Sequence, residues 1–369
     1  MHNTFTAPQT THAGIPHPTL QKALRCCLIR LSRGVYTVRR RCPVHEDFHA
    51  FIDDSRTLTL RSALGEQWTP ADSVRLRRTE YAGVLGTYRH YDPDDVIGGT
   101  SAALIHGVPL LDARPPRRVA TVHSGSARSA FDPRISGGEP GDSVRVEVWN
   151  PRRSHNSRWI VRRRAVLTAD QTVLWKGRRI TTLARTCVDL ARLTTVLEGL
   201  VAADWLIADA TARFGRNGGV RTREALSVAA DRCARMRGTA RAREAIALAT
   251  GRSESVAESL ALFRLVSFGI TGIRQQVPVE DHEGRMLARV DFMLEATDGV
   301  DVVIEVDGLL KYRNAGPRRE SDHGDALIRE KRREDRLRRR GYRVVRLTWK
   351  DLWNLPHLRT LLREAHVAV

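Results

Sequence analysis

The 369-residue sequence lacks any run of about 18 or more apolar residues, so no segment has the composition of a transmembrane helix. Its first residues lack the basic and then apolar segments of a secretory signal. Cysteine is sparse: there are five residues and no Cys-x-x-Cys pair, which argues against a zinc ribbon or a redox motif. A sparse, odd set of cysteines fits a reducing compartment. We therefore expect a cytoplasmic protein without a membrane partner.

Lysine is scarce too, because all but five of the 61 basic residues are arginine. Acidic residues number only 42, so the net charge is +19, which points to a polyanion such as nucleic acid. Residues 1–249 carry +16 of this charge and residues 250–369 carry +3. The first two thirds of the chain are therefore expected to hold the polyanion. The acids of the last third gather in short motifs that could hold a cation.

Two helices and a hairpin are expected at the start of the chain. Pro8–Ala13 and Thr19–Cys27 are expected to be helical, and a turn at Gly14 separates them. The next segment, Leu28–Val38, is typical of a two-stranded hairpin. This order is that of a winged helix, although a small structural domain would have the same pattern.

Charge on the hairpin favours DNA binding. Arg30, Arg33 and Arg39 lie on or beside the expected wing, where they could contact phosphates.

The middle region, residues 46–250, is expected to be a basic α+β domain without a catalytic constellation. A helix at Gly98–Leu110 ends at Gly and Pro, and a long helical section with breaks near Gly215 and Gly238 follows Ile180. Three strands are expected, at Val119–Val122, Val144–Val148 and Trp159–Val161.

Basic residues of this region lie close to two tryptophans. Arg152, Arg153 and Arg162–Arg164 flank Trp149 and Trp159, as in a nucleic-acid face with interleaved aromatic residues. A solvated strand edge would explain the same pattern.

The last third contains acids inside apolar strands. Ser255–Glu258 has the spacing of a capping box and opens an expected helix. Asp291 lies in the expected strand 289–294, and Glu305 and Asp307 lie on one face of the expected strand 302–308. A buried, unpaired carboxylate costs several kcal/mol, so such acids are usually paired, protonated or bound to a metal. Three converging acids predict a site for Mg²⁺ or Mn²⁺ that could activate a water for attack on a phosphate.

This order of elements, ending with a basic helix and a strand at 343–349, resembles the PD-(D/E)xK nuclease superfamily. Within it, the chain most resembles the domain family related to very-short-patch-repair (Vsr) endonucleases. The matching stretches lie at 253–259, 289–292, 304–312, 330–337 and 341–349. The resemblance implies a restriction-endonuclease-like α/β domain over residues 251–369 and Mg²⁺-dependent hydrolysis of DNA.

The resemblance also implies roles for single residues. Asp291 and Glu305 match the two metal-binding acids, and Glu258, or Glu254 a turn earlier, matches the first-helix acid that binds a metal-coordinated water. Asp307 stands where the superfamily has a lysine, so it is expected to be a further metal ligand. Lys311 is then the candidate for the missing basic group.

The basic segment 329–340 has two interpretations. Pairs at i and i+4, such as Glu334 with Arg338, would support an exposed helix. Eight basic residues exceed what these pairs need, so we also expect Arg332 and Arg333 to contact DNA and Lys331 to face the catalytic site.

The front of the chain resembles the winged-helix domain of AbiEi-type antitoxins of abortive-infection systems. Residues 13–20 and 29–36 carry this resemblance, which implies DNA binding without catalysis. The segment Thr100–Leu110 resembles the one that follows in actinobacterial proteins of this combined architecture.

Together these features predict a multidomain protein of α/β and α+β class. A winged helix over 1–45, a basic α+β region over 46–250 and a Vsr-like domain over 251–369 are expected. The expected function is Mg²⁺-dependent DNA cleavage in phage defence or DNA repair. Two alternatives remain: a non-catalytic DNA-binding regulator with a degenerate nuclease fold, and an RNA-processing partner of a toxin. A toxin or a second copy of the chain is a possible protein partner.

Overall fold

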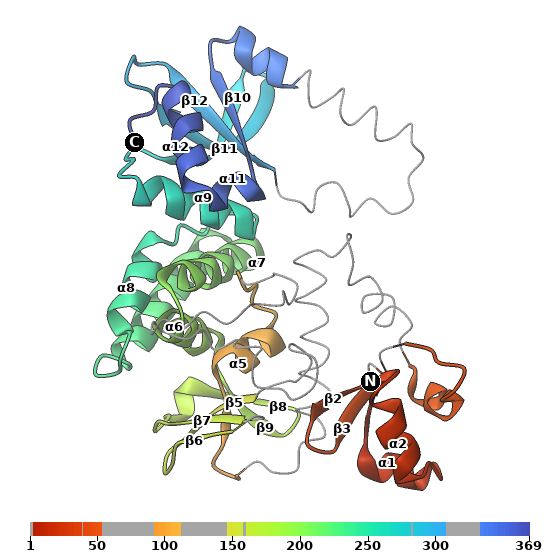
Figure 1. Cartoon of the computed structure of the whole chain (residues 1–369). Helices are drawn as coiled ribbons and strands as arrows, with labels where there is room; N and C mark the ends of the chain where they lie inside the picture. Colours follow the sequence, from red (N-terminus) through yellow and green to blue (C-terminus); the bar gives the residue numbers. More distant parts are fainter. Residues whose placement is uncertain are drawn as a thin grey trace. The chain divides into compact units, whose positions relative to one another are not determined.

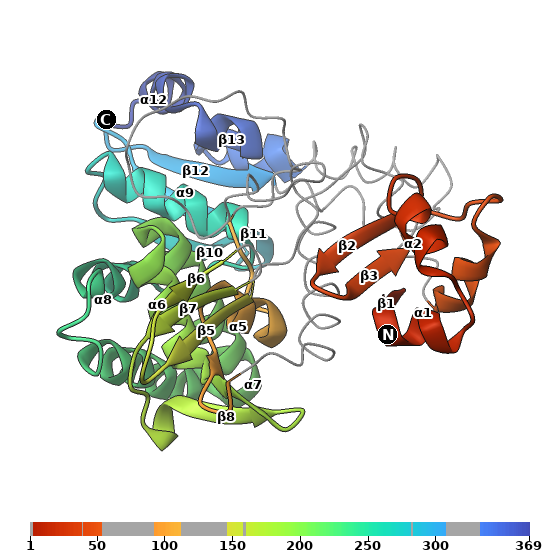
Figure 2. The same ribbon diagram turned by 60° about the horizontal axis from the view of Figure 1, so that its bottom comes forward.

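The computed structural model describes residues 3–38, 40–53, 92–111, 146–157, 160–281, 283–307 and 333–369. They form helices and several sheets, so the chain is a mixed α/β protein of the α+β multidomain type (Figures 1 and 2). Two compact units divide it: residues 1–202 with 225–243, and residues 203–224 with 244–369. The second unit thus includes residues 203–224, which lie in the middle region expected from the sequence. None of the described helices is long and apolar enough to cross a membrane.

The first elements form a helix pair and a three-stranded sheet in the order β1-β3-β2. Their bounds are β1 Thr4–Thr6, α1 Ala7–His12, α2 His17–Ala23, β2 Leu28–Ser32 and β3 Val35–Val38. Strand β1 was not expected from the sequence, and it pairs antiparallel with β3. Helix α2 ends before the expected Cys27, because the next residues form tight turns in which the amides of Cys26 and Cys27 donate to Ala23.

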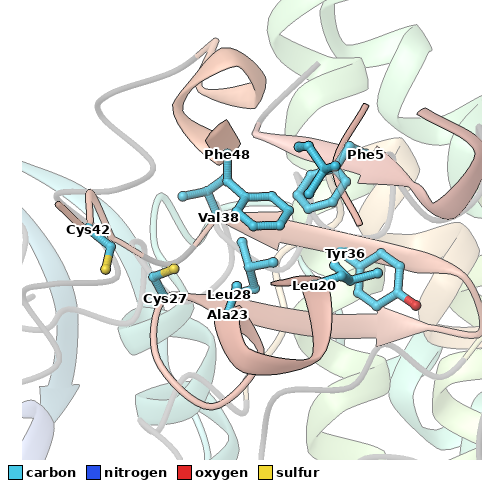
Figure 3. Close-up of a cluster of buried hydrophobic side chains, with 10 residues drawn as sticks. Phe5, Leu20, Ala23, Cys27, Leu28, Tyr36, Val38, Cys42 and Phe48 are labelled. Carbon is cyan, nitrogen blue, oxygen red and sulfur yellow. The ribbon is translucent and has the colours of Figure 1, made fainter. Parts of the chain in front are cut away.

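A single hydrophobic cluster holds these elements together (Figure 3). Its centre is Phe5 on β1, which stacks on Phe51 with ring centroids 4.3 Å apart. Phe51 belongs to the 3-10 helix η1 (Glu46–Phe51), so the chain after β3 folds back onto the first strand. The other buried members are Ile15, Leu20, Ala23, Cys27, Leu28, Tyr36, Val38, Cys42 and Phe48.

The middle region contains a mixed six-stranded sheet in the order β6-β7-β5-β4-β9-β8. Its strands are β4 Val96–Ile97, β5 Val146–Asn150, β6 His155–Asn156, β7 Ile160–Arg164, β8 Thr172–Trp175 and β9 Arg178–Thr181, with the short 3-10 helix η2 Ala169–Gln171 before β8. Strands β5 and β7 confirm the two expected strands near Val148 and Val161. The expected strand at 119–122 lies outside the described residues.

Helix α5 (Gly99–His106) is tied to this sheet by close backbone packing. A side chain at Gly98 would overlap the Trp149 ring, and one at Gly99 would overlap the Glu147 carboxylate. Because Gly99 has no side chain, the Glu147 carboxylate lies against the start of the helix, where its Oε2 accepts a hydrogen bond from the Thr100 amide over 2.8 Å. The glycine pair therefore lets the helix N-terminus approach the sheet closely.

The expected helical section consists of α6 (Leu183–Leu193), α7 (Val196–Asp231) and α8 (Thr239–Leu248). Helix α7 is interrupted at Gly215, whose φ of 68° is left-handed, and Gly238 takes a φ of 85° just before α8. Both expected breaks are therefore present.

The second unit contains a four-stranded sheet in the order β10-β11-β12-β13. Strands β10 (Arg274–Glu280), β11 (Met286–Glu295) and β12 (Asp301–Asp307) pair antiparallel, whereas β13 (Arg343–Thr348) is parallel to β12. Strand β10 was not expected. A helix over residues 333–339 precedes β13, and its Leu337 packs against Val303 of β12.

Three further helices complete this unit: α9 (Val256–Ser267), α11 (Trp349–Trp353) and α12 (Leu355–Glu364). Helices α9 and α11 lie side by side (Figure 1). Arg264 of α9 donates from Nε to the carbonyl of Leu352 over 3.0 Å, which joins them. The last strand is one residue shorter than expected. Thr348 caps α11 by accepting from the amide of Asp351, so Trp349 begins a helix.

The turn between β10 and β11 is stabilised by an ionised aspartate. Asp281 accepts hydrogen bonds from the backbone amides of Arg285 and Glu283, each over 2.9 Å, and from the Arg285 side chain. These bonds, first the one from the Arg285 amide, lower the pKa of Asp281 to about 2. The charged carboxylate therefore stabilises the folded state above its unfolded pKa of about 3.9, and this contribution is lost as the pH falls through the folded pKa.

Asp281→Asn is accordingly expected to lower the urea midpoint at neutral pH and to have a vanishing effect as the pH approaches about 2. Urea unfolding of both proteins across this pH range measures it. Glu283→Gln is the control, because the exposed Glu283 carboxylate pairs with the Arg285 side chain at the surface and its loss should change the midpoint less. A pH-independent difference between Asp281→Asn and wild type would contradict the charge argument.

Candidate functional site

Glu258 lies in the first turn of α9 and is fixed there by its own helix cap. Ser255 accepts from the Glu258 amide over 3.2 Å and donates its hydroxyl to Glu258 Oε1 over 2.8 Å. Two further donors, the Glu254 amide and Gln276 Nε2, each reach Oε2 over 2.9 Å. Ser255 is therefore the N-cap of α9 as expected, but the reciprocal half of a capping box is absent, because the Glu258 carboxyl accepts from the Glu254 amide and the Ser255 hydroxyl rather than from the Ser255 amide. These bonds hold the carboxyl group in a buried position.

The position of α9 itself depends on a buried aspartate. Asp204, in the first half of α7, accepts from the Thr250 amide over 2.8 Å and from the Ser259 hydroxyl over 3.0 Å. It also accepts from the Gly251 amide. These bonds anchor the chain on both sides of the Glu258 cap.

Asp291 and Glu305 occupy adjacent antiparallel strands. The pairing of Phe292 with Ile304 places Asp291 opposite Glu305 one step further along, and opposite residues share a face of the sheet. The amide of Val306 donates to Asp291 Oδ2 over 2.8 Å, which fixes this carboxylate beside Glu305. Asp291 and Glu305 are only 8% and 4% exposed, so both charges are largely removed from water.

Electrostatics link Glu258 to this pair. Burial raises the pKa of the Glu258 carboxyl, and the negative charge of Asp291 raises it further, against hydrogen bonds that lower it. Three buried carboxyl groups from α9, β11 and β12 therefore lie in one region of the second unit.

Arginines neutralise the acids of β12. Arg333 Nη1 lies 3.0 Å from Glu305 Oε1, and Arg346 Nη1 lies 3.4 Å from Asp307 Oδ2. Arg346 stands beside Glu305 in the parallel pairing of β12 and β13, and its Nε also donates to Glu334 over 3.0 Å. Arg333 was expected to contact DNA, and here its guanidinium group pairs with an acid of the site.

The three expected cation ligands do not form one cluster. In the described parts of the chain, Asp291, Glu305 and Asp307 do not form a group whose ligand atoms all lie within 4.8 Å of one another. Mg²⁺ needs only one or two carboxylates, because water and phosphate oxygens complete its shell. Asp291 and Glu305, on neighbouring positions of β11 and β12, are the two carboxylates that would hold such a cation.

The other expected site residues lie outside the described residues or on the N-terminal hairpin. Lys311, Lys331, Arg332 and Arg39 lie outside the described residues. Arg30 is exposed on β2 and Arg33 is exposed in the turn between β2 and β3, as expected for the hairpin.

The basic segment of the middle region does not form an aromatic nucleic-acid face in its described part. Trp149 is only 3% exposed, and Arg162 is buried in a bidentate pair with Asp95, with bonds of 2.7 and 2.5 Å. Arg153 is exposed and pairs with Asp92 over 2.8 Å. The interpretation with Trp149 as a stacking platform is therefore wrong, because this residue fills the core.

The sequence did not reveal three residues that support the acidic site, nor a cluster of potential metal ligands in the first unit. Asp204, Gln276 and Arg346 give no signal because they contact the site only through the tertiary fold. The cluster consists of Cys26, Cys27, Cys42 and His45. Its cysteines have no Cys-x-x-Cys spacing, so the sequence did not mark them as a site.

No family model, curated protein or solved structure matches the chain. The assignment of a function therefore rests on the residues and their arrangement.

Proposed function

We propose that the protein is a DNA-binding, Mg²⁺-dependent endonuclease whose C-terminal residues form a Vsr-like PD-(D/E)xK domain. One observation carries the proposal: three buried carboxyl groups, Glu258, Asp291 and Glu305, come together from α9, β11 and β12. Buried negative charges destabilise the folded state unless a positive charge neutralises them, and a divalent cation can supply that charge.

Each acid has a distinct part in this proposal. Asp291 and Glu305 hold the cation, and the Val306 amide keeps the Asp291 carboxylate in place. Glu258 orients a water within reach of the phosphate, and its cap with Ser255 and Gln276 restricts its side chain. Mg²⁺ or Mn²⁺, when bound, supplies Lewis-acid polarisation of the scissile phosphate and lowers the pKa of a bound water.

The first unit supplies DNA affinity in this proposal. The helix pair followed by the β2–β3 hairpin has the order of a winged helix, and Arg30 and Arg33 are exposed on the hairpin. Residues 1–249 hold +16 of the net charge, so binding should weaken steeply as salt rises.

A cleavage assay tests the proposal. Purified full-length protein is incubated with supercoiled, linear and single-stranded DNA in Mg²⁺ or Mn²⁺, and nicks are scored on gels. We expect cleavage that requires the metal and stops with EDTA. The same preparation binds labelled DNA in a salt titration, which shows that it is folded. Tight DNA binding with no cleavage of any DNA form in either metal would contradict the proposal.

A second function is favoured by one observation. Glu305 and Asp307 each pair with an arginine, and Asp307 stands where the nuclease superfamily has its lysine. Acids neutralised in this way need no cation, as in a non-catalytic, antitoxin-like regulator. Sequence-selective, salt-dependent DNA binding that is unchanged by EDTA, with no cleavage, is the result this alternative predicts.

A further inference from the structure

Four potential soft-metal ligands meet at one place in the N-terminal module, residues 3–53. The Sγ atoms of Cys26, Cys27 and Cys42 and a ring nitrogen of His45 all lie within 4.8 Å of one another. Cys26 Sγ is 3.5 Å from Cys42 Sγ, and His45 Nδ1 is 3.5 Å from Cys42 Sγ and 3.6 Å from Cys27 Sγ. All five cysteines of the chain are free thiols.

The fold of the hairpin creates this cluster from two distant segments. Cys26 and Cys27 lie between α2 and β2, whereas Cys42 and His45 lie between β3 and η1. The pairing of Leu28 with Val38 brings the two segments together at the open end of the hairpin. In Figure 3 the sulfur atoms of Cys27 and Cys42 lie at one end of the hydrophobic cluster, away from Phe5 and Tyr36.

Three of the six distances between these ligand atoms agree with the edges of a tetrahedron around zinc. Bonds of about 2.3 Å to sulfur and about 2.0–2.1 Å to nitrogen give S···S edges of about 3.8 Å and S···N edges of about 3.5 Å. The two His45 distances match the second value, and the Cys26–Cys42 distance is close to the first. A disulfide would involve only two of the four groups, and it would leave the convergence of His45 without a reason.

The surroundings suit a thiolate–zinc centre. Three thiolates and one Zn²⁺ carry one net negative charge, and the Arg40 guanidinium lies 3.6 Å from Cys26 Sγ, where it offsets that charge. The Cys42 amide donates to His49 Nε2 over 3.0 Å and fixes the backbone of this ligand.

We propose that Cys26, Cys27, Cys42 and His45 form a structural Zn²⁺ site that joins the start of β2 to the segment after β3. Each cysteine gives up its thiol proton on binding, and His45 ligates through Nδ1 with its proton on Nε2. Four protein ligands leave no open position, so this centre is structural rather than catalytic. Sulfur ligands also select zinc over Mg²⁺, which keeps this site chemically separate from the acidic site.

The small apolar cluster beside these ligands gives the metal a role. Among the described residues its members lie between Phe5 and Ile52, and a small hydrophobic core is often supplemented by a metal, a disulfide or a partner. A zinc centre at the open end of the hairpin would hold its two strands and the η1 segment in a fixed arrangement.

Metal analysis of the full-length protein tests the proposal. Protein from zinc-supplemented cells is expected to contain about one Zn²⁺ per chain, and Cys42→Ser or Cys26→Ser to retain less than about one tenth of that. The control is Cys187→Ser, which replaces a buried thiol of α6 outside the cluster and should keep the full zinc content.

Cobalt gives a second readout that does not depend on overall stability. Co²⁺ added to metal-free wild type should produce the intense visible bands of tetrahedral thiolate coordination, and these bands should weaken in Cys26→Ser, whose side chain is only partly buried. Three results would overturn the proposal: wild type that stays metal-free after reconstitution, variants that keep full zinc, or fewer than five thiols on titration of the denatured protein. The last result would indicate a disulfide instead.

Discussion

Protein carrying Asp291→Asn or Glu305→Gln is expected to cleave DNA at least about 10³-fold more slowly than wild type in Mg²⁺. Each change removes one negative ligand of the cation, and losing metal-based stabilisation of the transition state costs several kcal/mol, about tenfold in rate for each 1.4 kcal/mol. Single-turnover cleavage of a linear substrate measures the effect directly.

The two substitutions are chosen to preserve the fold. An asparagine at 291 keeps a carbonyl oxygen that can accept from the Val306 amide. The matched control is Glu295→Gln, which removes an exposed charge from the same strand and should leave the rate unchanged. If both site variants cleave at the wild-type rate while their thermal unfolding matches wild type, the acids of β11 and β12 are not the catalytic ligands.

The order of elements in the second unit could be predicted because local signals agree with the fold. The N-cap at Ser255 starts α9, and the apolar runs around Asp291 and Glu305 form β11 and β12. Strand β10 was missed because Gln275, Gln276 and Pro278 interrupt its pattern. These residues form a strand because they pair with β11, and this pairing is a tertiary interaction.

Contacts across the fold explain what the sequence could not show of the two sites. Nothing near Arg346 in the sequence indicates Asp307, and only the parallel pairing of β12 with β13 brings them together. The cysteine cluster has the same origin. Cys26 and Cys42 are 16 residues apart, and no short-range spacing marks them as partners until the hairpin register is known.

Asp189→Ala is expected to destabilise the first unit by about 3–5 kcal/mol, because it leaves two buried guanidinium groups without their shared counter-ion. Asp189 is fully buried in α6 and accepts from Arg185 Nε over 2.9 Å and from Arg192 Nη1 over 2.6 Å. Arg185 also lies 5.7 Å from the centre of the Trp149 ring, so this network reaches the core of the six-stranded sheet. Hydrogen exchange of the α6 amides measures the opening free energy of this region.

An exposed ion pair of the same unit is the control. Asp231→Ala removes an aspartate that pairs with Arg243 over 2.9 Å at the surface, and it should cost less than about 1 kcal/mol. Replacing Arg185, Asp189 and Arg192 together with Met, Leu and Met should recover much of the loss, because the penalty comes from unpaired buried charge rather than from the absence of the pair. Equal effects of Asp189→Ala and Asp231→Ala would show that the buried network does not stabilise the unit in this way.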